Sequence, residues 1–118
     1  MIHAPQPASR LLERARELLV EAGDVDALLA IAACRIALEA TLKAHVDRVA
    51  NTPLEAPSAS LAAAVLHHHG VVTRGERNAV RRLTRVASRA IHTASATPEQ
   101  AQRVFDFSTS IVERLHNR

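Results

Sequence analysis

Aromatic residues are almost absent from this 118-residue chain. It has no tryptophan and no tyrosine, and its two aromatic side chains are Phe105 and Phe107. Proteins that recognise single-stranded nucleic acid by stacking its bases need several exposed rings. The composition therefore argues against a base-stacking platform.

Cysteine and long apolar runs are also scarce. The single cysteine, Cys34, forms no intrachain disulfide and supplies no structural zinc set, which favours a reduced, cytoplasmic setting. The longest near-apolar run, residues 27–34, is far shorter than the roughly 20 residues of a membrane span. Residues 1–5 lack the basic and apolar regions of a signal peptide. We expect a cytoplasmic protein without membrane association and without a cofactor.

Glycine is rare and alanine abundant, with 3 Gly against 23 Ala. Alanine is the best helix former and is depleted in strands. The chain is predicted to be an all-α, up-and-down bundle of about five helices. Its length fits a single domain over residues 1–118, with the core at about residues 8–117.

Periodicity and end signals place the first three helices. The first is predicted from about Ala8 to Ala22, before Gly23, and the second from an Asp24 cap to about Ala50. A proline-containing loop follows over residues 51–57. A short third helix is then expected from a cap at Ser58 or Ser60 to His69, where Gly70 ends it.

Two capping boxes open the last two helices. Thr73 with Glu76 begins the fourth, and Thr97 with Gln100, followed by a proline at the first helical position, begins the fifth. The fourth helix is predicted to bury Val80, Leu83, Ala87, Ala90 and Ile91. The fifth is predicted to bury Ala101, Val104, Phe105, Ser108, Ile111, Val112 and Leu115.

Positive charge is concentrated in one segment. The net charge is only +3, but residues 73–96 carry six arginines and a single carboxylate, Glu76. On the fourth helix Arg85 and His92 are two turns apart and share a face, and their neighbours on it are Arg81, Ser88 and Arg89. This pattern is typical of a solvated charged face. It also suits a site, because an arginine beside an imidazole can hold a phosphate and move a proton.

Charged residues also interrupt the apolar stripe of the second helix. A helical wheel places Arg35 and Glu39 within that stripe, four residues apart. They are interpreted either as a buried structural ion pair or as the lining of a functional cleft. The stripe consists of Val25, Leu28, Ala32, Leu42, Val46 and Val49. The opposite face carries Ala30, Ala33, Ala37, Ala40 and Ala44, and this small-residue face, with the polar face of the fourth helix, is predicted to form a homodimer interface.

The run His67-His68-His69 invites comparison with a metal site. Consecutive helical residues point about 100° apart, so three in a row cannot all bind one ion from a regular helix. Histidines at a helix C-terminus also complement the helix dipole. We therefore expect no metal here, and we expect His3, His45 and His116 to lie on the surface.

Two motifs resemble those of HEPN domains (higher eukaryotes and prokaryotes nucleotide-binding), in particular their compact bacterial branch. The segment Arg35-Ile36-Ala37-Leu38-Glu39 is similar to the R-x-A-L-E pattern on the long early helix of that branch. Residues 83–92 are similar to its L-x-R-x-G-N-x-A-x-H pattern, with Ala87 and Ser88 in place of Gly and Asn. The Thr-capped last helix also matches, and the similarity covers about residues 8–117.

The resemblance implies a homodimer that is either a binding module or a ribonuclease. HEPN ribonucleases carry an Arg and a His a few residues apart, commonly with a polar residue after the Arg. Here Val86 follows Arg85. The first expectation is therefore a non-catalytic binding or accessory module, in defence, toxin–antitoxin or phage-related biology, that binds a nucleotide, RNA or a partner protein through the basic fourth helix.

The alternatives are an enzyme and a scaffold. In a metal-independent endoribonuclease, His92 would be the general acid or base and Arg85 would stabilise the phosphorane. Arg81 and Arg89 would hold flanking phosphates, with Glu39, Arg35 and Ser88 in support. In a helical protein-interaction scaffold, the basic helix would instead dock an acidic partner.

Overall fold

The computed structural model describes residues 6–21, 23–50 and 58–117, and within them it contains helices and no strand. The helices are α1 (Gln6–Glu21), α2 (Asp24–Ala50), α3 (Ala59–His68), α4 (Arg74–Thr93) and α5 (Pro98–His116). The expectation of an all-α bundle is confirmed. The predicted loop at 51–57 and the expectations for residues 1–5 and Ala22 lie outside the described residues.

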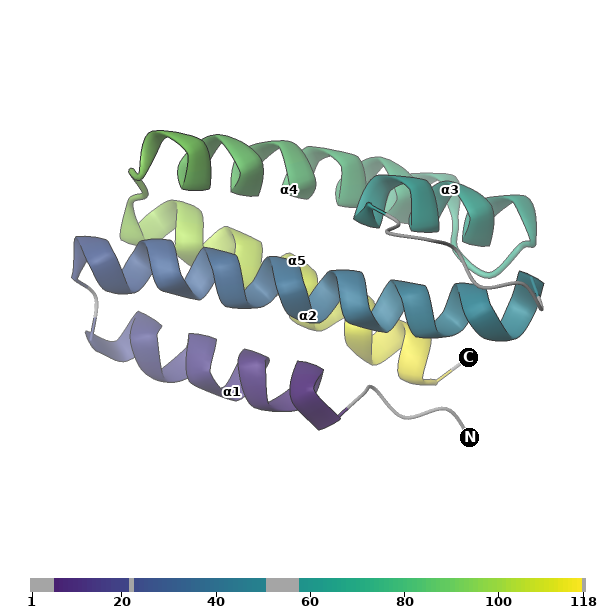
Figure 1. The fold of residues 1–118 in the computed structure, drawn as a ribbon, viewed down its shortest axis with the longest axis horizontal. Coiled ribbons are helices and arrows are strands. Elements are labelled where there is room, and N and C mark those ends of the chain that lie inside the picture. Colours follow the sequence, from purple (N-terminus) through teal and green to yellow (C-terminus); the bar gives the residue numbers. More distant parts are fainter. Residues whose placement is uncertain (1–5, 22, 51–57, 118) are drawn as a thin grey trace.

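The long helices α1, α2, α4 and α5 run along the long axis of the molecule (Figure 1). α1 runs antiparallel to α2, and α4 runs antiparallel to α5, as short connections between long helices favour. The short α3 packs beside α2 and α4 at one end. The 27 residues of α2, at 1.5 Å each, make it about 40 Å long, and it contacts every other described helix.

Local signals start and end the helices where the sequence predicts. Both capping boxes form: the Thr73 hydroxyl accepts from the Glu76 N–H at 3.1 Å, and the Thr97 hydroxyl accepts from the Gln100 N–H at 3.2 Å. The Ser58 hydroxyl caps α3, and Gly70 follows that helix with φ +74°, in the left-handed region.

The cap of α2 differs from the prediction. Gly23, not Asp24, occupies the cap position, because its carbonyl accepts the first helical hydrogen bond, from the Ala27 N–H at 2.9 Å. The Gly23 N–H donates to the carboxylate of Asp26 at 3.2 Å. Asp26 is therefore an acidic residue that stabilises this helix start.

The core surrounds α2 more completely than a two-sided helical wheel predicts. The small-residue positions Ala30, Ala33 and Ala37 are all buried within this chain. A helix that is apolar all round is typical of the centre of a bundle. The predicted use of this face as a dimer interface is therefore wrong, since the chain's own helices cover most of it.

The surface of α2 lies elsewhere. Val25, expected in the core stripe, is 69 % exposed, and Leu29 and Ile36 are about half exposed. With the partly exposed Ala32 they form an apolar stripe at helical spacing along the first half of α2. We call these four residues the α2 stripe.

Candidate functional site: the outer face of α4

α4 turns its basic side away from the protein. Its buried positions include Val80, Leu83, Ala87 and Ala90, as predicted, whereas Ile91 is 39 % exposed and was wrongly placed in the core. The opposite side is exposed, and the structure brings together there all the residues that the sequence assigned to it. They are Arg81, Arg85, Ser88, Arg89 and His92. We call these five residues the α4 outer face.

Two contacts hold the start of α4 in place. The Glu76 carboxylate accepts from the Thr73 N–H at 2.8 Å, which completes the capping box. Its second oxygen accepts from Arg114 Nη1 on α5 at 3.3 Å. Glu76 is only 5 % exposed, so the carboxylate of α4 is directed into the protein. The helix therefore presents its arginines to solvent without a neutralising carboxylate of its own.

The arginines of α4 remain unpaired. Among the described residues, ion pairs join Arg14 to Glu17, Arg35 to Glu39 and Arg114 to Glu76, and no arginine of α4 takes part in one. Arg85 and His92 are both exposed and two turns apart on the same face. An unpaired guanidinium can bind phosphate through two parallel hydrogen bonds, and a neighbouring imidazole can act as a general acid or base.

Arg35 and Glu39 pair with each other but are not buried. Arg35 Nε donates to Glu39 Oε1 at 3.1 Å, and the two side chains are 35 % and 32 % exposed. The expectation of a buried ion pair is therefore wrong, because the α2 face that carries them is only partly covered. The hydrogen bond of Glu39 goes to Arg35 and not to Arg85 or His92.

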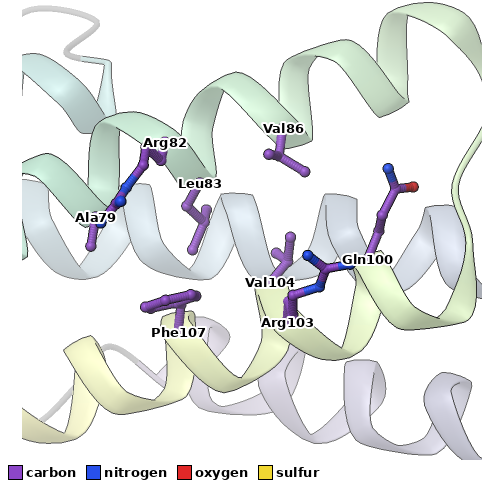
Figure 2. Close-up of a pocket in the computed structure, with 8 residues that line it drawn as sticks. All are labelled: Ala79, Arg82, Leu83, Val86, Gln100, Arg103, Val104 and Phe107. Atoms are coloured by element: carbon purple, nitrogen blue, oxygen red, sulfur yellow. The ribbon is translucent and has the colours of Figure 1, made fainter.

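A groove separates α4 from α5 on one flank of the outer face (Figure 2). Its volume is about 330 Å³. The apolar side chains lining it include Leu83 and Val86 from α4 and Val104 and Phe107 from α5. This groove was not predicted from the sequence, since Val86 and Phe107 lie outside the apolar stripes of their helices. Their exposure, 40 % and 50 %, is a property of how the two helices are spaced.

The histidine run does not gather ligands. His67 is partly buried with its Nδ1 3.2 Å from the Val72 carbonyl, whereas His68 and His69 are exposed and meet edge to face. In the described part of the chain, no group of three His, Cys, Asp or Glu side chains is placed to hold a metal ion.

The burial of two side chains, His45 and Cys34, was not predicted from the sequence. His45, expected on the surface, is 2 % exposed and lies between two backbone carbonyls. Cys34 is fully buried. Burial raises the pKa of its thiol to about 12, although the neighbouring Ser108 hydroxyl acts in the opposite direction. A thiol in this state is a core side chain and not a nucleophile.

No protein-family model, curated protein or solved structure matches the chain. None of the described helices is long and apolar enough to cross a membrane.

Proposed function

We propose that the protein is a cytoplasmic, HEPN-like, non-catalytic module that binds RNA through the α4 outer face. The observation that carries this proposal is the row of exposed, unpaired arginines on a helix whose only carboxylate is buried. Phosphate contacts supply most of the affinity of sequence-independent nucleic-acid binding. A nucleotide and an acidic protein partner are the other ligands that such a face can hold.

The spacing of the arginines suits an extended phosphate backbone. The arginines of the α4 outer face run from Arg81 to Arg89, a span of about 12 Å along the helix at 1.5 Å per residue. No aromatic side chain stands among them, so base stacking contributes nothing on this face. We therefore expect binding that depends on charge and discriminates weakly between sequences.

A metal-independent endoribonuclease is the second candidate. The observation in its favour is that Arg85 and His92 are both exposed on one face, open to a substrate. His92 would act as general acid or base, and Arg85 would stabilise charge on the phosphorane. Two features weigh against cleavage: Val86 follows Arg85 in place of a polar residue, and Glu39 is bonded to Arg35.

Self-association belongs to the same proposal. The α2 stripe spans residues 25–36 and carries three large apolar side chains that are about half exposed or more. A contiguous apolar surface is typical of an interface. A two-fold axis across the stripe would pack it against its own copy. We therefore propose a homodimer that uses this stripe in place of the small-residue face.

Salt dependence of RNA binding tests the proposal. A fluorescein-labelled single-stranded RNA of mixed sequence is titrated at several salt concentrations, and its anisotropy gives the affinity. Replacing Arg81 and Arg85 by Gln should weaken binding and reduce the logarithmic salt slope by about 1.4, since each phosphate contact contributes about 0.7.

The matched control changes the same charge on another helix. Arg10 and Arg16 are exposed on α1 and take part in no ion pair of the described residues. Replacing both by Gln should leave affinity and salt slope nearly unchanged. If wild-type RNA affinity is absent, or if both double variants lose it equally, the α4 outer face is not an RNA site. A nucleotide and an acidic protein partner would then remain as the ligands of this face.

A further inference from the structure

The groove between α4 and α5 continues beyond the part drawn in Figure 2. Ala79, Arg82 and Phe107 line that part and also line a second hollow of about 260 Å³, which reaches Ser110 and Arg114 on α5. The two hollows therefore form one groove. Along α5 it extends from Gln100 to Arg114, about 21 Å at 1.5 Å per residue.

The groove combines an apolar floor with a basic rim. Leu83 and Val104 are buried at its base, while Val86 and Phe107 are 40 % and 50 % exposed at its edge. Arg82 and Arg103 stand on the two sides, one from each helix, and neither takes part in an ion pair of the described residues.

Acidic groups are nearly missing from the groove. The one carboxylate that lines it is Glu76, which is 5 % exposed and bonded to Arg114. The rim therefore carries unpaired positive charge next to apolar surface. An occupant of complementary chemistry has carboxylates beside an apolar stripe.

The length of the groove and its exposure to water favour a helix as its occupant. A helix of about 14 residues is about 21 Å long and matches the groove. Such a helix would cover the exposed edges of Val86 and Phe107, whereas an acyl chain in so open a groove would stay half in water. RNA fits less well, because a single aromatic ring lines the groove and base binding depends on stacking.

We propose that the groove between α4 and α5 docks an acidic amphipathic helix of a partner protein. The leucine-like face of that helix would lie on Leu83, Val86, Val104 and Phe107, in the helix-in-groove mode of peptide recognition. Its carboxylates would flank that face and pair with Arg82 and Arg103. This site is separate from the α4 outer face and goes beyond the proposed RNA binding.

The test uses a synthetic probe of defined chemistry. The probe is a labelled helical peptide of about 14 residues, with leucines at helical spacing flanked by glutamates; its partner peptide has every glutamate replaced by lysine. The acidic peptide should bind the full chain, and the lysine peptide should bind at least tenfold more weakly. Failure of the acidic peptide to bind, or equal binding of both peptides, would overturn the proposal.

Variants then locate the site. Arg103→Glu and Phe107→Ser each change an exposed side chain of the groove. Each should weaken binding of the acidic peptide at least tenfold. Arg16→Glu on α1 is the matched control and should leave the affinity for the acidic peptide unchanged. Far-UV circular dichroism verifies the fold of each variant. If one groove variant fails to fold, the other still tests the proposal.

The same variants separate this site from the RNA site and from other occupants. Arg85→Glu should weaken RNA binding and leave peptide binding unchanged. Arg103→Glu should weaken peptide binding and leave RNA binding unchanged, so each proposal can fail without the other. Three outcomes would overturn the docking of a partner helix. If Arg103→Glu weakens RNA binding as much as peptide binding, the groove binds RNA. If dodecanoate below its micelle concentration displaces the peptide, the groove binds an acyl chain, and if Phe107→Ser abolishes self-association of the wild type, it binds a second copy of the chain.

Discussion

The imidazole of His45, on α2, joins the centre of the bundle to the end of α5. Its Nε2 lies 3.1 Å from the carbonyl oxygen of Leu115, and its Nδ1 lies 2.9 Å from the carbonyl oxygen of Thr41. Carbonyls in the last turn of a helix lack the usual partner four residues ahead. An imidazole N–H directed at the Leu115 carbonyl can supply such a partner, so the ring is accommodated in the core, where a surface position was expected.

Removing this ring should destabilise the protein. His45→Ala leaves a cavity beside α5 and removes the cross-helix contact with Leu115, at a cost of about 2–4 kcal/mol. Urea unfolding followed by circular dichroism measures the change. The control is His68→Ala, an exposed histidine whose loss should cost less than about 0.5 kcal/mol. Equal effects of the two substitutions would contradict the bridging role.

The buried thiol of Cys34 should make stability fall in alkaline solution. Its pKa is raised from 9.0 to about 12 in the folded protein. Above pH 9 the unfolded thiol loses its proton while the folded one keeps it, so rising pH favours unfolding until the folded thiol ionises too. The expected loss approaches about 1.4 kcal/mol per pH unit in this range.

Cys34→Ala isolates this contribution, because every other titrating group is retained. Urea unfolding of both proteins between about pH 8 and pH 10 should show the free energy of wild type falling more steeply than that of the variant. The stability contribution is present in full below pH 9. Parallel pH profiles for the two proteins would show that the thiol is ionised, or accessible, in the folded state.

The sequence predicts most of the fold because the signals that start and end helices are local. Thr73 with Glu76 and Thr97 with Gln100 form the expected capping boxes, since each depends on residues three positions apart. The basic side of α4 could be predicted for a similar reason. A helix with a strong apolar stripe, such as Leu83 and Ala87, has only one way to face the core.

Which faces of α2 are buried could not be predicted in this way. Alanines cover nearly its whole circumference, so periodicity does not distinguish a covered side from an open one. The structure buries Ala33 and Ala37 and exposes Ile36, an outcome set by the positions of the other helices. For the same reason the groove at Val86 and Phe107 depends on the spacing of α4 and α5, which no local pattern encodes.

The exposure of Arg35 and Glu39 predicts a small contribution to stability. A buried pair would cost about 3–5 kcal/mol when one partner is removed, but these side chains are about one-third exposed. Glu39→Ala should therefore cost about 0.3–0.5 kcal/mol, as for helix-surface pairs four residues apart. A double-mutant cycle with Arg35→Ala measures the coupling. A loss above about 2 kcal/mol would show that the pair is desolvated in solution.

His92 separates binding from catalysis. In the non-catalytic module, His92→Ala leaves RNA affinity nearly unchanged, because the arginines of the α4 outer face supply the phosphate contacts. Incubation of labelled RNA with wild type and EDTA, followed by gel electrophoresis, should show no cleavage. Cleavage that persists in EDTA and disappears in His92→Ala would instead establish the endoribonuclease. Arg85→Lys, which keeps the charge but loses the planar fork, would then test the transition-state role of Arg85.

The α2 stripe should determine the oligomeric state. Ile36→Glu places a charge at the end of the stripe, and in a homodimer it would put a carboxylate of each copy against the apolar stripe of the other. Light scattering at tens of micromolar should give twice the chain mass of 12.8 kDa for wild type and the single mass for the variant. Leu61→Glu is the matched control, because Leu61 on α3 is 50 % exposed, much as Ile36 is at 52 %. The Leu61→Glu variant should remain dimeric. A monomeric wild type would contradict the proposed homodimer, and a dimer that survives Ile36→Glu but not Leu61→Glu would place the interface on α3.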